Sequence, residues 1–208
     1  VTAKNLSEYL GKKIYRMDEV NKKDEIGIVR GLAWTSCGGE TLEIEVNVMH
    51  GKGDCELTGQ MGDVMKESAI TAISYVRSQS DKYNIDEDFF EKNDIHIHIP
   101  EGAVPKDGPS AGITMATAIM SAVCANPVRA DVAMTGEITL RGRVLPIGGL
   151  KEKLLAAKTA GVTTVLVPEQ NKSDVYDIDN EITDGMELKY VNNMEQVINN
   201  AFVTTAQP

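Results

Sequence analysis

The sequence predicts a mixed α/β domain with a hairpin-rich N-terminal half and a βαβ-like C-terminal half. Two apolar runs, 26–35 and 41–48, flank Gly38-Gly39 and predict an early β-hairpin. The second run alternates apolar and polar residues, as a half-buried strand does. Beyond a long apolar segment at 111–125, short apolar runs alternate with helical patterns. This order of elements favours a sheet whose strands pair partly in parallel.

The segments after the hairpin are assigned from periodicity and from their Gly and Pro content. In order, we expect a Gly-rich loop at 50–54, a helix at 61–77, a charged loop at 81–94, a strand at 95–99 and a Gly- and Pro-rich segment at 100–110. The apolar helix that follows ends before Pro127. Although no charge occurs between Asp107 and Arg129, the apolar part is short, so a buried core helix is favoured over a membrane span.

The C-terminal half reads as strands separated by helices. We expect a strand at 132–134, a hairpin at 138–147 turning at Arg141-Gly142, a helix at 149–160 stopped by Gly161, a strand at 163–167, a short helix at 172–178, a strand at 187–191 and a helix at 194–202.

The composition limits the compartment and the partners. The 208 residues, 42% hydrophobic and 25% charged, are enough for one domain with an ordinary core. A formal net charge of −10 argues against nucleic acid or an anionic membrane as a partner. Three cysteines with no close pair favour free thiols in a reducing compartment, and no signal peptide is visible at the N-terminus.

The pentapeptide GPSAG at 108–112 fits the G-x-S-x-G pattern, which places a serine at a sharp turn into a helix. Glycines let the chain turn tightly, and the first N–H groups of the helix have no intrahelical partner, so they can stabilise an oxyanion. Taken alone, the pentapeptide fits a Ser110 that merely caps a core helix at least as well.

A nucleophilic serine needs a base, and the histidines are poor candidates. All three (His50, His96 and His98) precede Ser110, which excludes the order of an α/β-hydrolase but not that of a chymotrypsin-like enzyme. His96 and His98 alternate with isoleucines and are typical of one polar strand face. Without a third ligand they do not predict a metal site.

A lysine in an apolar setting can instead lose enough pKa to accept the serine proton. The helix at 149–160 offers Lys151, Lys153 and Lys158. The neighbours of Lys151 and of Lys153 at helical spacing are all apolar, so spacing does not choose between these two. Lysines that merely edge an amphipathic helix are the commoner case.

Taken together, the motifs of the chain resemble those of the Lon protease family. The runs that carry the resemblance are DGPSAGITM at 107–115, TGEITLRG at 135–142, PIGGLKEK at 146–153, GLAWT at 31–35 and PEGA at 100–103. They are similar to the C-terminal peptidase domain, and they span nearly the whole chain. A long ordered set of motifs is far more specific than any one of them.

This resemblance implies a Lon peptidase-domain fold and a serine–lysine dyad, with Ser110 as nucleophile and Lys153, not Lys151, as base. It gives supporting roles to Thr135 beside the lysine ammonium, to Asp107 before the serine and to Glu45. The resemblance also implies that Trp34 and Met134 contact a substrate held as an added strand.

The resemblance also sets expectations for domains and partners. We expect a linker remnant at 1–10, the peptidase domain at 11–203 and a disordered tail at 204–208. The family carries an AAA+ motor, but the chain lacks a phosphate-binding G-x-x-x-x-G-K-[ST] loop. No cofactor is therefore expected in this chain, with ATP and Mg confined to the missing ATPase module. Expected partners are unfolded or damaged proteins and further copies in a hexamer, in the bacterial cytosol rather than the mitochondrial matrix.

Two other functions stay open at this point. Relatives that keep the fold and lose the dyad are non-catalytic assembly domains, but both Ser110 and Lys153 are present here. A serine hydrolase that uses His96 or His98 is the third possibility.

Overall fold

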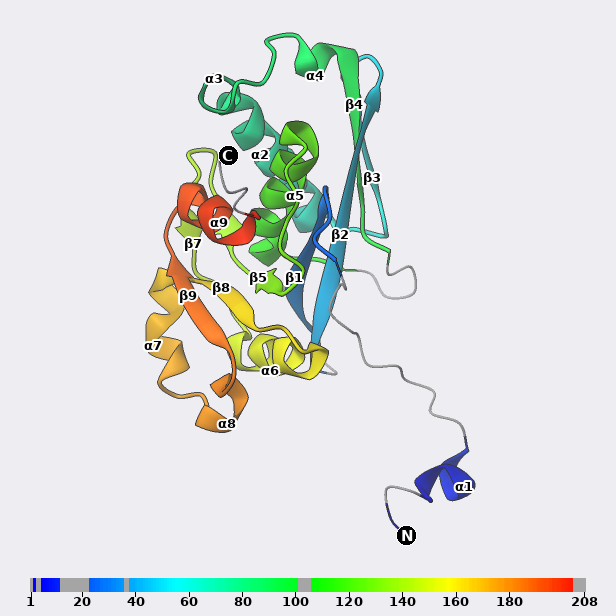
Figure 1. The fold of residues 1–208 in the computed structure, drawn as a ribbon, viewed down its shortest axis with the longest axis vertical. Helices are drawn as coiled ribbons and strands as arrows, with labels where there is room; N and C mark the ends of the chain where they lie inside the picture. Colours follow the sequence, from blue (N-terminus) through cyan, green and yellow to red (C-terminus); the bar gives the residue numbers. More distant parts are fainter. Residues whose placement is uncertain (1, 3–4, 12–22, 36–37, 101–105, 204–208) are drawn as a thin grey trace.

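The computed structural model describes residues 2, 5–11, 23–35, 38–100 and 106–203. A seven-stranded sheet forms the centre, in the order β3-β4-β2-β1-β5-β8-β9 (Figure 1). Its strands are β1 (Ile28–Thr35), β2 (Gly38–His50), β3 (Cys55–Thr58), β4 (Asn93–His98), β5 (Val132–Met134), β8 (Thr164–Pro168) and β9 (Glu187–Val191). A separate two-stranded ribbon pairs β6 (Glu137–Ile138) with β7 (Val144–Leu145).

The strand directions confirm the predicted mixed fold. Strand β2 is antiparallel to β1, as the early hairpin requires, and it is also antiparallel to β4. Strands β1, β5, β8 and β9 run parallel, and β3 is parallel to β4. The hairpin prediction holds because β2 starts at Gly38, whose φ of +126° is a conformation that other residues rarely adopt.

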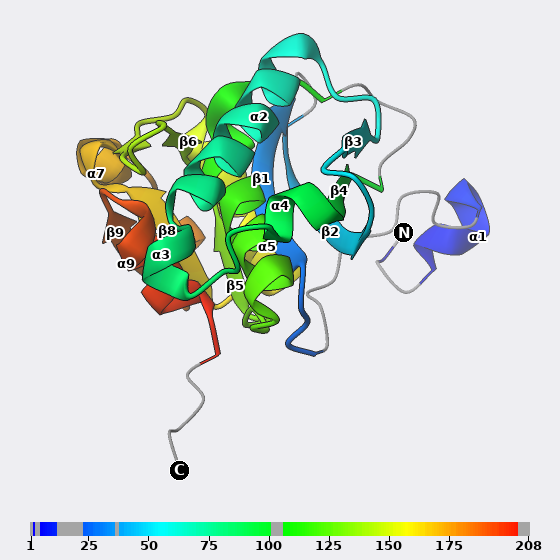
Figure 2. The ribbon, with the colours of Figure 1, turned by 90° about the horizontal axis from the view of Figure 1, so that it is seen from above.

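Helices cover both faces of the sheet. The longer ones are α2 (Asp63–Ser78), α5 (Gly112–Cys124), α6 (Leu150–Ala160) and α9 (Met194–Ala201). Helices α2 and α5 lie side by side against one face (Figure 2) and share a core with residues such as Ile44 and Ile97. Helix α6 packs on the opposite face in a second core, with Leu32 and Val165. The molecule therefore has three layers around two apolar cores.

The charge-free segment is the core helix that the sequence predicts. The first ten residues of α5, Gly112 to Ser121, are buried between the sheet and α2. Among the described residues, none of the helices combines the length and the apolar character that crossing a membrane requires.

Several short elements differ from the sequence predictions. The expected linker contains α1 (Leu6–Leu10), and the expected loop at 81–94 contains α4 (Phe89–Lys92) and most of α3 (Ser80–Tyr83). Strand β3, also unpredicted, follows a turn in which one Asp94 carboxylate oxygen accepts N–H bonds from Lys52, Gly53 and Asp54 at 2.7, 3.0 and 2.9 Å.

Further short helices are η1 (Pro109–Ala111), η2 (Glu169–Asn171), α7 (Lys172–Val175) and α8 (Asn180–Thr183). The predicted tail at 204–208 lies outside the described residues.

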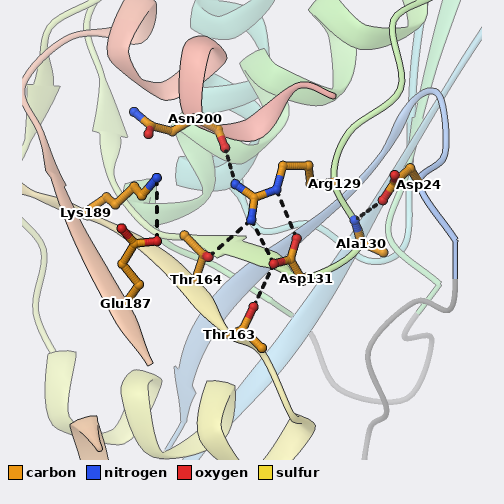
Figure 3. Close-up of polar contacts among 9 residues, drawn as sticks. All are labelled: Asp24, Arg129, Ala130, Asp131, Thr163, Thr164, Glu187, Lys189 and Asn200. Carbon is orange, nitrogen blue, oxygen red and sulfur yellow. Dashed lines mark hydrogen bonds and ion pairs between the residues drawn. The ribbon is translucent and has the colours of Figure 1, made fainter. Parts of the chain in front are cut away.

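A polar cluster fixes the start of β5 (Figure 3). The Arg129 guanidinium donates to both carboxylate oxygens of Asp131, at 3.1 and 2.8 Å. It also donates to the carbonyl of Asn200, at 3.3 Å. The Thr163 hydroxyl donates to the same Asp131 carboxylate at 2.7 Å. These bonds hold the pKa of Asp131 below its ordinary value, against the effect of its partial burial. The strand that they anchor leads directly into Thr135.

Candidate active site

A cavity of about 740 Å³ opens at the carboxyl end of β1. Its walls come from the last residues of β1, the start of α2, the segment 106–111, the segment 146–149 and the first turns of α6. Ligand sites in sheets with parallel strands characteristically lie at the carboxyl ends of those strands. Ser110, Lys153, Asp107 and Trp34 all line this cavity.

Ser110 lies in the sharp turn that its pentapeptide predicts. The turn starts at Gly108, whose φ of +125° suits glycine, and continues as the short helix η1 into α5. Ser110 is half-buried. Its carbonyl accepts bonds from the N–H of Gly136 at 2.8 Å and from the Thr135 hydroxyl at 3.4 Å. The nucleophile candidate is thus tied by its backbone to the residues that follow β5.

Lys153 is buried on the inner face of α6. The residue is only 3% exposed, and its ammonium donates to the Thr135 hydroxyl at 3.2 Å. Burial lowers the pKa of Lys153 to about 8, because a low-dielectric site penalises the charged form. A pKa near 8 leaves a useful fraction of neutral amine at physiological pH.

The Lys151 side chain points away from the cavity. Its side chain is 53% exposed, and its ammonium lies 3.1 Å from the Asp179 carboxylate, next to α8. Helical spacing leaves the choice between these two lysines open. The structure distinguishes them because only Lys153 is on the face of α6 that is buried against the cavity.

Thr135 connects the two candidate dyad residues. It is fully buried, accepts the Lys153 N–H bond and donates its own proton to the Ser110 carbonyl. With one N–H of Lys153 engaged in this way, the orientation of the amine is restricted. This is the position beside the lysine ammonium that the family resemblance implies for Thr135.

Asp107 shapes the site through the backbone. One of its carboxylate oxygens accepts N–H bonds from Met65 at 3.0 Å and from Gly108 at 2.9 Å. The first of these caps the N-terminus of α2, where Gly62 has no side chain to do so. Gly62 is also required by space, because a Cβ there would lie 2.3 Å from the Asp107 carboxyl carbon.

Trp34 lies at the rim of the cavity and is 58% exposed. Its ring lies over Gly149, where a Cβ would approach the Trp34 Cγ to 2.9 Å, and Gly149 has a φ of +67°. Both facts explain why a glycine precedes α6. An exposed indole at a cavity rim is available to a bound substrate.

Two predicted site residues are not brought to the cavity. Met134 is fully buried on the α5 side of the sheet, where its sulfur lies 3.5 Å from the Thr117 hydroxyl. Strand β5 thus turns the Met134 side chain into the core, and the substrate contact expected of Met134 stays a prediction. Glu45, on β2 opposite Ile28 and His98, is not among the described residues that line the cavity.

The histidines occupy a different part of the sheet. His96 Nε2 and His98 Nδ1, both on β4, lie 2.8 and 2.7 Å from the hydroxyl of Thr58 on β3. Neither ring is among the described residues lining the cavity with Ser110. In the part of the chain that the structure describes, no group of three or more His, Cys, Asp and Glu side chains is arranged to hold a metal ion.

Sequence reasoning missed two charged residues of the cavity, Glu152 on α6 and Lys106. Lys106 is 4% exposed and contacts the carboxylate of Glu40 on β2. Lys106 and Glu40 are far apart in sequence, and periodicity detects only local neighbours. The one available signal was the position of Lys106 directly before the motif that contains Ser110.

The known proteins to which this chain is similar are Lon proteases. Residues 1–204 match the family model for the Lon protease (S16) C-terminal proteolytic domain. The chain is 64% identical over 203 residues to the Lon protease of Lachnoclostridium phytofermentans, which is 98% of this chain and 25% of that protein. It is 56% identical over 208 residues to that of Brevibacillus choshinensis, or 100% of this chain and 26% of that protein. It is 54% identical over 203 residues to Lon protease 1 of Bacillus subtilis, or 98% and 26%. The chain thus spans about a quarter of the length of these relatives.

Proposed function

The chain belongs to the Lon protease (S16) family, whose C-terminal proteolytic domain it matches, and on this premise we propose that it is a serine endopeptidase with a Ser110–Lys153 dyad. The observation that carries this proposal is the burial of Lys153. A lysine that is 3% exposed, with a pKa of about 8 and a bond to Thr135 beside Ser110, has the properties of a general base.

The proposed reaction is acyl transfer. Neutral Lys153 removes the Ser110 proton as the hydroxyl oxygen attacks a peptide carbonyl. Backbone N–H groups at the start of η1 and α5, those of Ser110 and Ala111 first, stabilise the oxyanion. The lysine then protonates the departing amine, and a water molecule hydrolyses the ester by the reverse path. Thr135 keeps the amine oriented throughout, because it accepts one of its N–H bonds.

The substrates that suit this cavity are extended peptides. Apolar side chains such as Leu32 and Met65 line the cavity, together with the exposed Trp34 ring. We propose unfolded or damaged proteins as substrates, delivered by an AAA+ module outside this chain. The dyad chemistry itself uses neither metal nor organic cofactor, so ATP and Mg would act only in that module. The bacterial relatives support a cytosolic location.

Hydrolysis of an unfolded protein by the purified chain tests this function. We expect slow cleavage of unfolded casein and of a short fluorogenic peptide, with no dependence on ATP and with full inhibition by a serine-reactive boronate. The boronate mimics the tetrahedral intermediate and therefore requires a competent nucleophile. Absence of both hydrolysis and boronate binding at high chain concentration would contradict the proposal.

We also propose that the chain assembles into hexameric rings that are weak when the domain is alone. A closed ring uses interfaces that join two different patches on neighbouring subunits. An attached motor would raise the effective concentration of the domains, whereas a formal charge of −10 on each subunit opposes assembly most at low salt.

Sedimentation across a range of concentrations, at low and moderate salt, measures this assembly. We expect a monomer at low salt and low concentration and a growing hexamer fraction at moderate salt. A stable dimer would contradict the ring, and a strict monomer with full activity would contradict the need for it.

A further inference from the structure

An ion pair between the buried Lys106 and the partly exposed Glu40 joins the segment before Ser110 to the β1–β2 hairpin. Lys106 lies four residues before Ser110 and is only 4% exposed. Its ammonium contacts the carboxylate of Glu40, which is on β2 directly opposite Ala33 of β1. A buried ammonium is costly unless a carboxylate compensates it, so this contact constrains both segments.

The backbone of Lys106 is anchored on the other side, against the start of α2. The Gly62 N–H donates to the Lys106 carbonyl at 2.7 Å, and the Lys106 N–H donates to the Gln60 carbonyl at 3.4 Å. The next residue, Asp107, caps α2. The segment that leads to Ser110 is therefore held between α2, through its backbone, and the hairpin, through one side chain.

The β1–β2 hairpin also packs directly on α6, the helix that carries the proposed base Lys153. Gly39, next to Glu40, is so close to α6 that a Cβ there would lie 2.0 Å from the Glu152 carbonyl oxygen and 3.1 Å from the Lys153 backbone nitrogen. Only a glycine allows this approach. Gly39 thus contacts the backbone of Lys153, and the next residue, Glu40, contacts Lys106 in the segment before Ser110.

We propose that Lys106 and Glu40 are positioning residues, whose ion pair sets the distance between Ser110 and Lys153 through the β1–β2 hairpin. The inference rests on the proposed dyad. Replacing Glu40 takes one carboxylate away from the buried Lys106 ammonium, and replacing Lys106 breaks the contact with the partly exposed Glu40. In both cases the segment before Ser110 loses its side-chain anchor to the hairpin. A displacement of about 1 Å in a catalytic pair can lower a rate by about 100-fold.

Three variants test the pair: Glu40→Gln, Lys106→Met and the exchanged double variant Glu40→Lys/Lys106→Glu. Asp179→Asn is the matched control, because it removes an ion pair to α6 on the exposed side, at Lys151. We expect each single variant to lower the kcat for a short peptide by about tenfold or more, with KM changed less than about threefold. The double variant should recover part of the loss, and the control should match the wild type.

The pH profile of kcat distinguishes two ways in which the ion pair could act: by setting the distance between Ser110 and Lys153, or by changing the pKa of Lys153 through its charges. Glu40→Gln leaves an extra positive charge, which would lower the pKa of Lys153, whereas Lys106→Met leaves an extra negative charge, which would raise it. A field effect alone would therefore move the acid limb in opposite directions and leave the high-pH plateau of kcat unchanged. Positioning lowers that plateau in both variants. An unchanged plateau in both would overturn the inference.

Amide hydrogen exchange tests the anchoring without relying on activity. We expect peptides covering 106–112 to exchange faster in Glu40→Gln and Lys106→Met than in the wild type, and at the wild-type rate in Asp179→Asn. If the wild-type chain fails to cleave peptides, the dyad proposal fails and exchange still decides whether the pair anchors the segment. If the wild type cleaves peptides and both single variants keep its kcat and its exchange rates, the positioning role alone is refuted.

Discussion

Replacing Ser110 by alanine or Lys153 by methionine is expected to lower peptide hydrolysis by at least about 1,000-fold. The first change removes the nucleophile and the second removes its general base, and neither group is effective without the other. Methionine fills a volume similar to that of the lysine stem and packs well in an apolar site. The Lys153→Met chain should therefore fold, as circular dichroism would show. Initial rates on a short fluorogenic peptide measure the effect without involving a motor domain.

Lys151→Met is the matched control for this prediction, since it changes a neighbouring lysine of the same helix. Lys151 is half-exposed and pairs with Asp179 on the surface, where ion pairs contribute little. The peptidase activity of the Lys151→Met variant should stay within about twofold of that of the wild type. Loss of activity in Lys151→Met together with activity in Lys153→Met would reverse the assignment of the base.

The pH dependence should show an acid limb near pH 8. The active form of Lys153 is the neutral amine, and its pKa is lowered to about 8 by burial, so the rate should rise with pH and level off above that value. At pH 6 about 1% of the amine is neutral, which predicts a rate about 100-fold below the plateau. Measuring kcat for the peptide from pH 6 to pH 9.5 gives the limb directly.

The histidine variants provide the contrast. An acid limb between pH 6 and 7 that disappears in His96→Gln or His98→Gln would mark a histidine base. We expect both variants to keep the limb near pH 8. Their rings contact Thr58, on the β3–β4 part of the sheet, instead of lining the cavity.

Much of the fold could be predicted because its longer elements have strong local patterns. Helix α6 ends before Gly161, which has a φ of +84°, as the sequence predicts. Strands β5 and β9 have the predicted bounds. The missed elements are short and depend on distant partners. Strand β3 has only four residues and is placed by its pairing with β4 and by the Asp94 turn.

The site could be predicted in part, for a similar reason. The turn at Ser110 follows from its glycines, and the burial of α6 follows from its apolar spacing. Spacing did not separate Lys153 from Lys151, because that choice depends on which face of α6 meets the sheet. The burial of the Met134 side chain could not be predicted, because the side-chain direction at the end of a short strand is set by the sheet. The pairing of Lys106 with Glu40 could not be predicted, because the two residues are far apart in sequence.

The rate at which a peptidyl phosphonate labels the chain, followed by mass spectrometry as a function of pH, tests the central claim that Lys153 activates Ser110. The predicted result is a single label on Ser110, formed at a rate that rises with pH to a plateau above about pH 8 and that is abolished in Lys153→Met. Labelling of Ser110 at an unchanged rate in Lys153→Met, or labelling at another residue, would contradict the account.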